Sequence, residues 1–386
     1  MAAKEADWAW LPELLLDSII NKLIYPVDYV RFGSVCKHWL WVATAQNTYK
    51  ACCSKVPMLM IPARDGSTKS RSLYSVTQGK NTGVELPVPY NRRCCGSSHG
   101  WLAFAMDDLA ITLYNPFSGK QINLPPLVKN FKPEDEDEYE PEYYVRKVAL
   151  SADPLRNPDG YEAVAIYGGM NDLAFLKAGH KAWTPVPVGK VVKSDFRASD
   201  VIYFEGRMCV VNRYNWVMPG RIVSVDTTSR RIGTVARWRV KSQQEEEATM
   251  AQAGAYLVES SCGELLMVNR LLSTEAPSTS NEAPSTGKLK VYKIQIRDGR
   301  REEVKNLGDD SIFLGDNQSM SVLASEVVVG CQPNSIYYSD DYCEFAYPDG
   351  PHDMAIFDLR DGSFRSHYVP NPLHKKIPPP LWILSR

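Results

Sequence analysis

Apolar residues near the start of this chain follow the spacing of two consecutive helices. The first is expected to begin at Leu11-Pro12, because proline is tolerated in a first helical turn, and to end before Pro26, which disfavours helical geometry at Tyr25. Asp28 is placed to cap the second helix. The apolar positions are Leu14, Leu15, Leu16, Ile19, Ile20, Leu23 and Ile24 in the first helix, and Val30, Phe32, Val35, Cys36, Trp39 and Leu40 in the second.

This apolar surface is larger than the segment can bury alone. At about 100° per residue, the apolar positions of the first helix spread over roughly half of its circumference, wider than the stripe of an ordinary surface helix. A segment of about 40 residues has too little interior to cover them. Two interpretations follow: the helices form a cap packed on the rest of the chain, or another protein covers them. Residues 41–56 are expected to continue as helix and then linker.

The pattern changes after Met58 to short runs rich in Val, Ile, Tyr, Phe and Trp, separated by Gly, Asn, Asp and Pro. Such runs are typical of an all-β sandwich, barrel or propeller. They form a loose repeat of about 35–55 residues, and each unit has the pattern of several short strands joined by turns. The units are 57–90, 94–126, 145–187, 199–240, 255–307 and 320–369.

One such unit cannot bury both faces of its sheet without neighbours, which favours a ring of blades over a β-sandwich with irregular loops. We therefore predict a small all-α segment followed by a large all-β domain, a β-propeller of about six blades. The expected boundaries are a helical domain at 1–50, a linker at 51–57 and the propeller at 58–386.

Three stretches are predicted to lie outside the blades. The acidic run 133–142 is expected to be a solvated connection. The sequence EAPSTSN at 275–281 is nearly repeated at 282–288, and this Pro/Ser/Thr-rich duplication is expected to contribute nothing to a packed core. The proline-rich end, IPPPLWIL at 377–384, is expected to lie on the rim or to supply an edge strand near the ring closure.

Composition describes an ordinary globular protein, with 44% hydrophobic and 23% charged residues in 386. A net charge of −1 gives no sign of a nucleic-acid or anionic-membrane partner. No apolar run reaches the roughly 18 residues of a membrane helix, and the N-terminus does not resemble a signal peptide. We expect the protein in the cytoplasm, the nucleus or both, with its nine cysteines reduced and acting as small core residues.

No set of residues has the spacing of a catalytic, metal or cofactor site. Gly96 to Gly100 matches G-x-S-x-G, but the following WLAFA reads as a strand where a nucleophile elbow needs a helix, so a turn is favoured. Gly168-Gly169 likewise predicts a turn, and the aspartates at 340, 341, 349 and 353 lack calcium-loop spacing. We predict no cofactor, no metal and a chain that is not an enzyme.

The N-terminal helices resemble an F-box over about 30 positions. The matching residues are Leu11, Pro12, Leu14, Leu15, Ile19, Ile20, Leu23, Asp28, Val30, Val35, Cys36, Lys37 and Trp39. The resemblance implies binding to a Skp-type adaptor and, through it, to a cullin-RING ubiquitin ligase. The implied adaptor-binding residues are Leu11, Pro12, Leu14, Leu15, Ile19, Ile20, Leu23, Val35, Cys36, Lys37 and Trp39.

The rest of the chain resembles the kelch-like domain of plant F-box proteins of the domain-of-unknown-function 295 class. The resembling stretches are 96–102, 113–127, 147–154, 182–187, 256–268, 313–322, 334–341, 356–364 and 378–382. The acidic run and the duplication depart from that pattern at loop positions. The resemblance implies a propeller that binds a target protein, without identifying the target.

Together these resemblances imply the substrate-recognition subunit of an SCF-type ubiquitin ligase, which holds a target near the ubiquitin-charged enzyme. Three alternatives remain open: an F-box scaffold or inhibitor outside a ligase, a sensor holding a small ligand in the central pocket, and an enzyme using the channel. Tyr214, Trp216 and Tyr342 are candidate target contacts, because aromatic residues often anchor interfaces, or equally blade packing.

Overall fold

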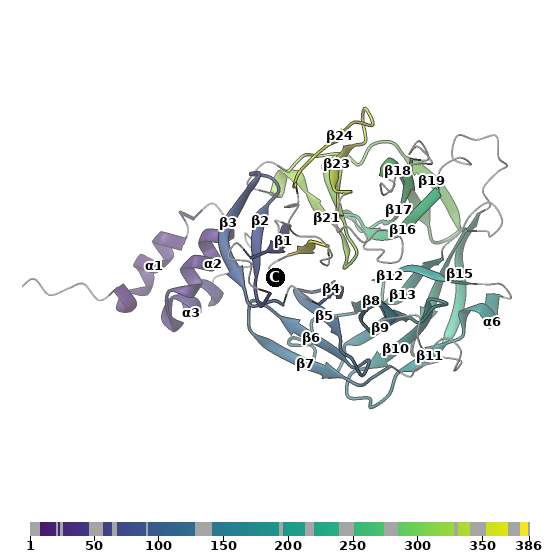
Figure 1. Cartoon of the computed structure of the whole chain (residues 1–386), viewed down its shortest axis with the longest axis horizontal. Helices are drawn as coiled ribbons and strands as arrows, with labels where there is room; N and C mark the ends of the chain where they lie inside the picture. The colour runs from purple at the N-terminus through teal and green to yellow at the C-terminus, as the bar shows by residue number, and fades with distance from the viewer. Residues whose placement is uncertain are drawn as a thin grey trace, which may run out of the picture.

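The computed structural model describes residues 8–20, 22–23, 26–45, 57–63, 68–89, 92–127, 141–192, 196–212, 220–238, 251–273, 285–327, 331–339, 353–369 and 379–384. A small group of helices stands beside a ring of six β-sheets (Figure 1). In this described part of the chain, no helix has the length and apolar character needed to cross a membrane.

The helical group consists of η1 (Trp8–Trp10), α1 (Glu13–Ile20), α2 (Pro26–Ser34) and α3 (Lys37–Ala45). Helix α1 starts as expected, with the amides of Leu15 and Leu16 donating to Pro12 O at 2.9 and 3.1 Å. It ends at Ile20, earlier than expected, because the next amides close short turns: Lys22 N donates to Ile19 O and Leu23 N to Ile20 O.

The expected second helix is in fact two. It breaks after Ser34, where Gly33 lowers helix propensity and the Ser34 hydroxyl donates to Arg31 O at 2.8 Å. The prediction that Asp28 caps this helix is wrong, because α2 begins at Pro26 and places Asp28 inside its first turn. Proline suits a helix start, since its missing N–H would have no partner there.

The six sheets follow the chain as blades 1 to 6. Blade 1 holds β25 (Leu381–Ile383), β1 (Met58–Pro62), β2 (Arg71–Ser75) and β3 (Lys80–Leu86). Blade 2 holds β4 (Cys94–Ser98), β5 (Trp101–Ala105), β6 (Ile111–Asn115) and β7 (Lys120–Leu124). Blade 3 holds β8 (Val145–Leu150), β9 (Glu162–Tyr167), β10 (Asp172–Lys177) and β11 (Thr184–Val186), with α5 (Pro141–Tyr144) before it and α6 (Val188–Val192) after it.

Blade 4 holds β12 (Ala198–Phe204), β13 (Arg207–Asn212), β14 (Gly220–Asp226) and β15 (Arg231–Trp238). Blade 5 holds β16 (Ala251–Glu259), β17 (Leu265–Leu272), β18 (Thr286–Gln295) and β19 (Arg300–Val304). Blade 6 holds five strands in the order β21 (Ser319–Leu323), β20 (Asp310–Leu314), β22 (Ser335–Tyr338), β23 (Ala355–Asp358) and β24 (Phe364–Arg365), with η4 (Ala324–Glu326) after β21. The predicted propeller of about six blades is confirmed.

The apolar cores lie between blades, as expected for sheets that cannot bury both faces alone. Separate clusters join blades 2 and 3, 3 and 4, 4 and 5, and 5 and 6, and a larger one joins blade 1 to blades 2 and 6. Gly96 marks how closely the inner strands approach. A Cβ on Gly96 would lie 2.0 Å from Val148 O of the next blade, so only glycine fits there.

The end of the chain closes the ring at its centre, where Figure 1 marks the C-terminus beside β1. Strand β25 pairs antiparallel with β1, joining Met58 to Ile383 and Met60 to Leu381. Trp382 is fully buried, and its carbonyl accepts from Asn317 Nδ2 at 2.8 Å. The prediction of an edge strand near the ring closure is therefore confirmed.

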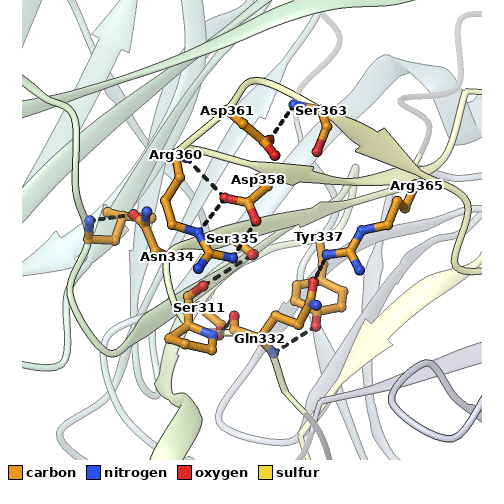
Figure 2. A network of polar contacts seen from close by, with 12 residues as sticks. Ser311, Gln332, Asn334, Ser335, Tyr337, Asp358, Arg360, Asp361, Ser363 and Arg365 are labelled. Atoms are coloured by element: carbon orange, nitrogen blue, oxygen red, sulfur yellow. Dashed lines mark hydrogen bonds and ion pairs between the residues drawn. The ribbon is translucent and has the colours of Figure 1, made fainter.

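Blade 6 departs from the simple repeat. Its strand β20 was not predicted, because the expected unit began only at Met320. Strand β20 pairs antiparallel with the inner strand β21 and parallel with β22. Polar contacts hold residues 331–334, which lead into β22, against the neighbouring strands (Figure 2). Ser311 Oγ donates to Gln332 O at 2.6 Å, Gln332 N donates to Tyr337 Oη at 3.0 Å, and Asn334 Oδ1 accepts from Leu307 N at 2.7 Å.

The duplicated Pro/Ser/Thr stretch corrects one expectation. Residues 274–284 lie outside the described residues, but Thr286 in the second copy begins β18 and is buried. Its amide and hydroxyl both donate to Asp353 Oδ2, at 2.8 and 2.7 Å, and its hydroxyl accepts from Arg270 Nε at 2.7 Å. Low-complexity composition therefore did not exclude a core position. Buried charges need hydrogen-bond partners, and the Thr286 hydroxyl supplies one to the buried Arg270–Asp353 ion pair.

Candidate functional site

The three helices have an apolar core of their own. Leu16, Ile20, Phe32, Val42 and Ala43 form it, and no residue of the ring belongs to the same cluster among the residues described. Trp39 packs against Phe32, with ring centroids 4.6 Å apart. Among the described residues, the core of the helices is thus separate from the cores of the propeller, and the cap interpretation loses its main support.

The segment before α1 is tied to α3. Trp39 Nε1 donates to Trp8 O at 3.0 Å, and His38 Nε2 lies 3.2 Å from Leu11 O. The rings of Trp10 and His38 stack with centroids 6.3 Å apart. These contacts hold Trp8 and Trp10 next to α1 and α3, and both indole side chains remain exposed.

Exposed apolar side chains concentrate on the helices. Of the 12 large hydrophobic residues exposed in the described part of the chain, seven belong to this short segment: Trp8, Trp10, Leu14, Leu15, Val35, Leu40 and Trp41. The largest exposed fractions are 79% for Leu14 and 78% for Trp10. Exposed apolar side chains gathered on one short segment mark a site of protein contact more often than scattered ones do. We call these seven residues the apolar face.

The predicted adaptor-binding residues divide by burial. Those exposed are Pro12, Leu14, Leu15, Val35 and Lys37; those half-buried are Leu11, Ile19, Leu23, Cys36 and Trp39. Ile20 has no exposed surface, because it belongs to the core of the helices, so it can only support the others. The prediction omitted Trp8, Trp10, Leu40 and Trp41; the signal available was the unusual density of tryptophan between residues 8 and 41.

The second feature is a cavity of about 430 Å³ at one end of the central channel. Inner strands of several blades line it, through Ser97, Lys147, Val201, Leu257 and Ser319 among others. Its volume falls within the range of small-molecule pockets. Lys147 lines this cavity and also a smaller one. The smaller cavity is lined by residues 146–147, 199–200, 254–256 and 315–316.

Two buried ion pairs join blades near that smaller cavity. Lys147 pairs with Asp200, whose carboxylate also accepts from the amides of Val201 at 2.7 Å and Leu257 at 2.8 Å. Arg93 donates to both oxygens of Asp316 at 2.8 Å, which joins blade 2 to blade 6. Burial alone would lower the pKa of Arg93, but the Asp316 carboxylate raises it above its ordinary value, so Arg93 stays charged.

The sequence features tested for catalysis have structural roles. His99 and Gly100 form the turn between β4 and β5, with φ of 54° and 80°, and no helix follows Ser98. Gly168 turns at φ 73° between β9 and β10. In the described ranges no group of three His, Cys, Asp or Glu side chains could hold a metal ion, and Asp353 belongs to the Arg270 ion pair.

Of the six cysteines that the structure describes, four fit the expected core role, Cys36 is half-buried and Cys262 is exposed. Cys94, Cys95, Cys209 and Cys331 are buried and free, and burial raises the pKa of the Cys94 thiol to about 11. Such thiols are unreactive at neutral pH. Cys262 is exposed in the turn after β16, so the prediction of a core position is wrong there. The acidic run at 133–140 and the candidate contacts Tyr214, Trp216 and Tyr342 lie outside the described residues.

Comparison with known proteins covers both the ring and the helices. A family model described as KIB1-4 beta-propeller matches residues 73–358. "F-box protein SKIP23" of Arabidopsis thaliana is 26% identical over 416 residues, covering 98% of this chain and 96% of that protein. "F-box protein At2g17036" of the same plant is 26% identical over 417 residues, with 98% and 95% coverage. "Putative F-box protein At3g25750" is 27% identical and covers 93% of each chain.

These names agree with the F-box and the propeller inferred from the residues. Relatives in a plant carry the F-box name and align over nearly the whole chain, helices included. The finer assignment, to the kelch-like domain-of-unknown-function 295 class, is not repeated by the comparisons and stays a prediction. The domain boundaries at residues 50 and 57 also stay predictions.

Proposed function

The chain belongs to the KIB1-4 β-propeller family, and on that premise we propose that it is the substrate-recognition subunit of an SCF-type ubiquitin ligase. Its apolar face would dock on a Skp-type adaptor, which connects it to the cullin. The propeller would hold a target protein. The chain itself would perform no chemistry, since catalysis of ubiquitin transfer then depends on proximity and orientation.

One observation carries this proposal: an apolar face on helices that already have a core of their own. The ring leaves Leu14, Leu15, Trp10 and Trp41 exposed, although a soluble chain gains by covering such side chains. Full burial of one such side chain contributes about 1.5–3 kcal/mol before association costs are counted. Several together suffice for a stable complex with one protein partner, and the F-box names of the relatives support a Skp-type adaptor.

The test is co-purification of the full chain with a Skp-type adaptor. The native chain is compared with the triple variant Leu14→Ala, Leu15→Ala, Ile19→Ala. A matched control carries Leu155→Ala, Met170→Ala and Val191→Ala, three exposed apolar residues of the propeller outside this face. We expect the native chain and the control to capture the adaptor in equal amounts, and the triple variant to lose it. A folded native chain that captures no adaptor would refute the proposal.

A ligase subunit and a sequestering scaffold differ in the fate of the target. The ligase shortens the half-life of the target in cells, and the scaffold leaves it unchanged. We also propose that the protein acts in the cytoplasm, the nucleus or both, where SCF ligases would meet their targets. A fluorescent fusion with the full chain tests this localisation, and exclusion from both compartments would refute it.

The cavity favours a second candidate function, a sensor whose small ligand in the central channel controls partner binding. The cavity has the volume for one small molecule, and polar side chains of Ser97 and Ser319 lie among apolar ones such as Val201 and Leu257. A ligand that binds there would raise the melting temperature of the full chain. Replacing Ser319, a half-buried residue of the cavity lining, by Trp would narrow the cavity and remove that shift; a shift retained in the variant would place the ligand elsewhere.

A further inference from the structure

Among the residues that the structure describes, a polar contact joins the helices to the ring. Helix α2 lies against β3, the outermost strand of blade 1 (Figure 1). Arg31 Nη2 donates to the backbone carbonyl of Thr82 at 2.5 Å, across 51 residues of sequence. On its other side, Arg31 Nη1 donates to Asp28 Oδ1 at 3.2 Å. The guanidinium therefore contacts its own helix through one nitrogen and the propeller through the other.

Strand β3 is bulged at the position of the Thr82 carbonyl. The pairing with β2 runs regularly through Ser72–Glu85 and again from Tyr74–Asn81, so residues 82–84 stand opposite Leu73 alone. A bulge interrupts the ladder and leaves backbone groups without strand partners. Thr82 Oγ1 donates to Leu73 O at 2.8 Å and Asn81 Oδ1 accepts from Gly83 N at 2.8 Å, which stabilises the bulge from within.

Gly83 completes the geometry. Its φ of +76° is a conformation that side chains with a Cβ rarely adopt, and a Cβ here would lie 3.3 Å from Arg31 Nη2. Glycine therefore permits both the bulge and the approach of the guanidinium.

Covalent connection alone does not fix the helices on the ring. Segment 46–56 joins α3 to the propeller, and a fully extended chain of that length spans up to about 40 Å. In the described part of the chain, the apolar core of the helices contains no ring residue, and the bond from Arg31 to Thr82 is a tie between the two parts. Domains joined without a large apolar interface are expected to move relative to one another.

We propose that the bulge at Thr82-Gly83 and Arg31 form an orienting contact, which holds the helices at one angle to the propeller. Resting on the proposed ligase function, this contact sets the direction in which the propeller presents a bound target to the ubiquitin-charged enzyme. Arg31 is then a positioning residue: it touches neither adaptor nor target, and it decides which lysines come within reach.

The orientation is measured on the full chain alone, by double electron–electron resonance between spin labels at Ser18 of α1 and Lys120 of β7. The labels are attached through non-canonical amino acids, because the exposed Cys262 would react with a thiol label. We expect one narrow distance distribution in the native chain. Arg31→Ala should broaden it, and Gly83→Ala, which disturbs the same contact from the ring, should broaden it as well.

Asp28→Ala is the matched control, since it removes the neighbouring ion pair and keeps the bond to Thr82. Its distance distribution should stay close to the native one. Circular dichroism melting of every variant separates loss of orientation from loss of fold. A folded Arg31→Ala chain with the native narrow distribution would overturn the proposal.

A second measurement reads the functional consequence in a reconstituted ligase, using the chain itself as the substrate. Mass spectrometry compares which of its lysines carry ubiquitin. We expect Arg31→Ala to spread the modification over more lysines while adaptor capture stays native. An unchanged set of lysines would overturn the positioning role. If the ligase does not assemble at all, the proposed function fails, and the resonance measurement still decides the orienting contact.

Discussion

At the scale of single residues, Leu15 and Leu16 show how one helix serves two surfaces. They are adjacent in sequence, yet the side chain of Leu15 is 51% exposed and that of Leu16 is fully buried. Neighbouring residues on a helix differ in direction by about 100°, so only one of them faces the core. The apolar sequence pattern predicted that both side chains are covered, either by the core of the helices or by a partner. It did not decide which of the two faces the core.

This pair gives a prediction about binding and stability. Leu15→Ala should weaken adaptor binding about 30-fold, because it removes roughly 2 kcal/mol of burial at the interface, and should leave stability nearly unchanged. Leu16→Ala should cost about 2–5 kcal/mol of stability in the helices through a buried cavity. Adaptor titration by calorimetry and thermal melting separate the two effects. Equal loss of stability in both variants would contradict the assignment.

A buried histidine gives the chain a pH dependence. His367 is surrounded by Tyr337 and Trp382, and its Nε2 lies 2.9 Å from Tyr338 O. Burial lowers its pKa from the ordinary 6.5 to about 4, so the ring is neutral in the folded chain at pH 7.

Below pH 6.5 the unfolded chain binds a proton at this histidine that the folded chain refuses until about pH 4. The neutral His367 side chain therefore contributes fully to the free energy of unfolding at neutral pH. This contribution falls by roughly 3 kcal/mol as the pH is lowered from 6.5 to about 4. His367→Gln keeps a donor near the Tyr338 carbonyl and removes the titration. Urea unfolding at several pH values should show a shallower fall for the variant, after the common slope from carboxylates is subtracted; identical slopes would contradict this role.

At the scale of elements, hydrogen bonds of side chains place the start of one strand at a position that the local sequence pattern did not predict. Strand β18 begins inside the Pro/Ser/Thr-rich duplication, because Thr286 reaches the buried pair of Arg270 and Asp353. Tyr338 Oη also donates to Asp353 Oδ1, at 3.1 Å. This cluster joins blade 5 to the segment that precedes β23 of blade 6.

Thr286→Val tests that cluster with a nearly isosteric change. Loss of the hydroxyl removes one bond to Asp353 and one from Arg270, and leaves a buried charged group less well satisfied. We expect a loss of about 2–3 kcal/mol in the free energy of unfolding. Thr112→Val, at a half-buried position on β6, is the control and should change stability by less than about 1 kcal/mol. Unfolding in urea measures both variants.

At the scale of the whole molecule, ring closure joins the two ends of the propeller sequence. Strand β25 pairs with β1 although more than 300 residues separate them, and Trp382 packs against Phe313 with ring centroids 5.0 Å apart. Without β25, the inner edge of β1 and the Asn317 side chain would lose their hydrogen-bond partners.

Truncation after Pro380 therefore should destabilise the whole propeller. Loss of a buried tryptophan alone costs about 3–5 kcal/mol, and the three pairs with β1 are lost as well. We expect a lower melting temperature and a poor yield of soluble chain. The matched control stops after Leu384, which keeps β25. A native melting temperature after the longer truncation would contradict closure by β25.

The sequence by itself determined the fold class, the repeat and the segment whose apolar surface exceeds its own interior. These follow from hydrophobic period and turn residues, which are local properties of the chain. Four of the six expected units coincide with observed blades; the unit at 57–90 lacks β25, which comes from the end of the chain, and the unit at 320–369 lacks β20.

Only the tertiary structure decided which apolar residues face outward, which charges pair across blades and where the helices rest on the ring. Ile20 belongs to the core of the helices while Trp10 belongs to the apolar face, and nothing in their residue type separates them. Arg93 finds Asp316 across 223 residues, and Arg31 finds Thr82 across 51. These contacts form only once the ring has closed and β3 has taken its bulged conformation. Both features are stabilised by residues that lie far apart in sequence, which a local pattern cannot reveal.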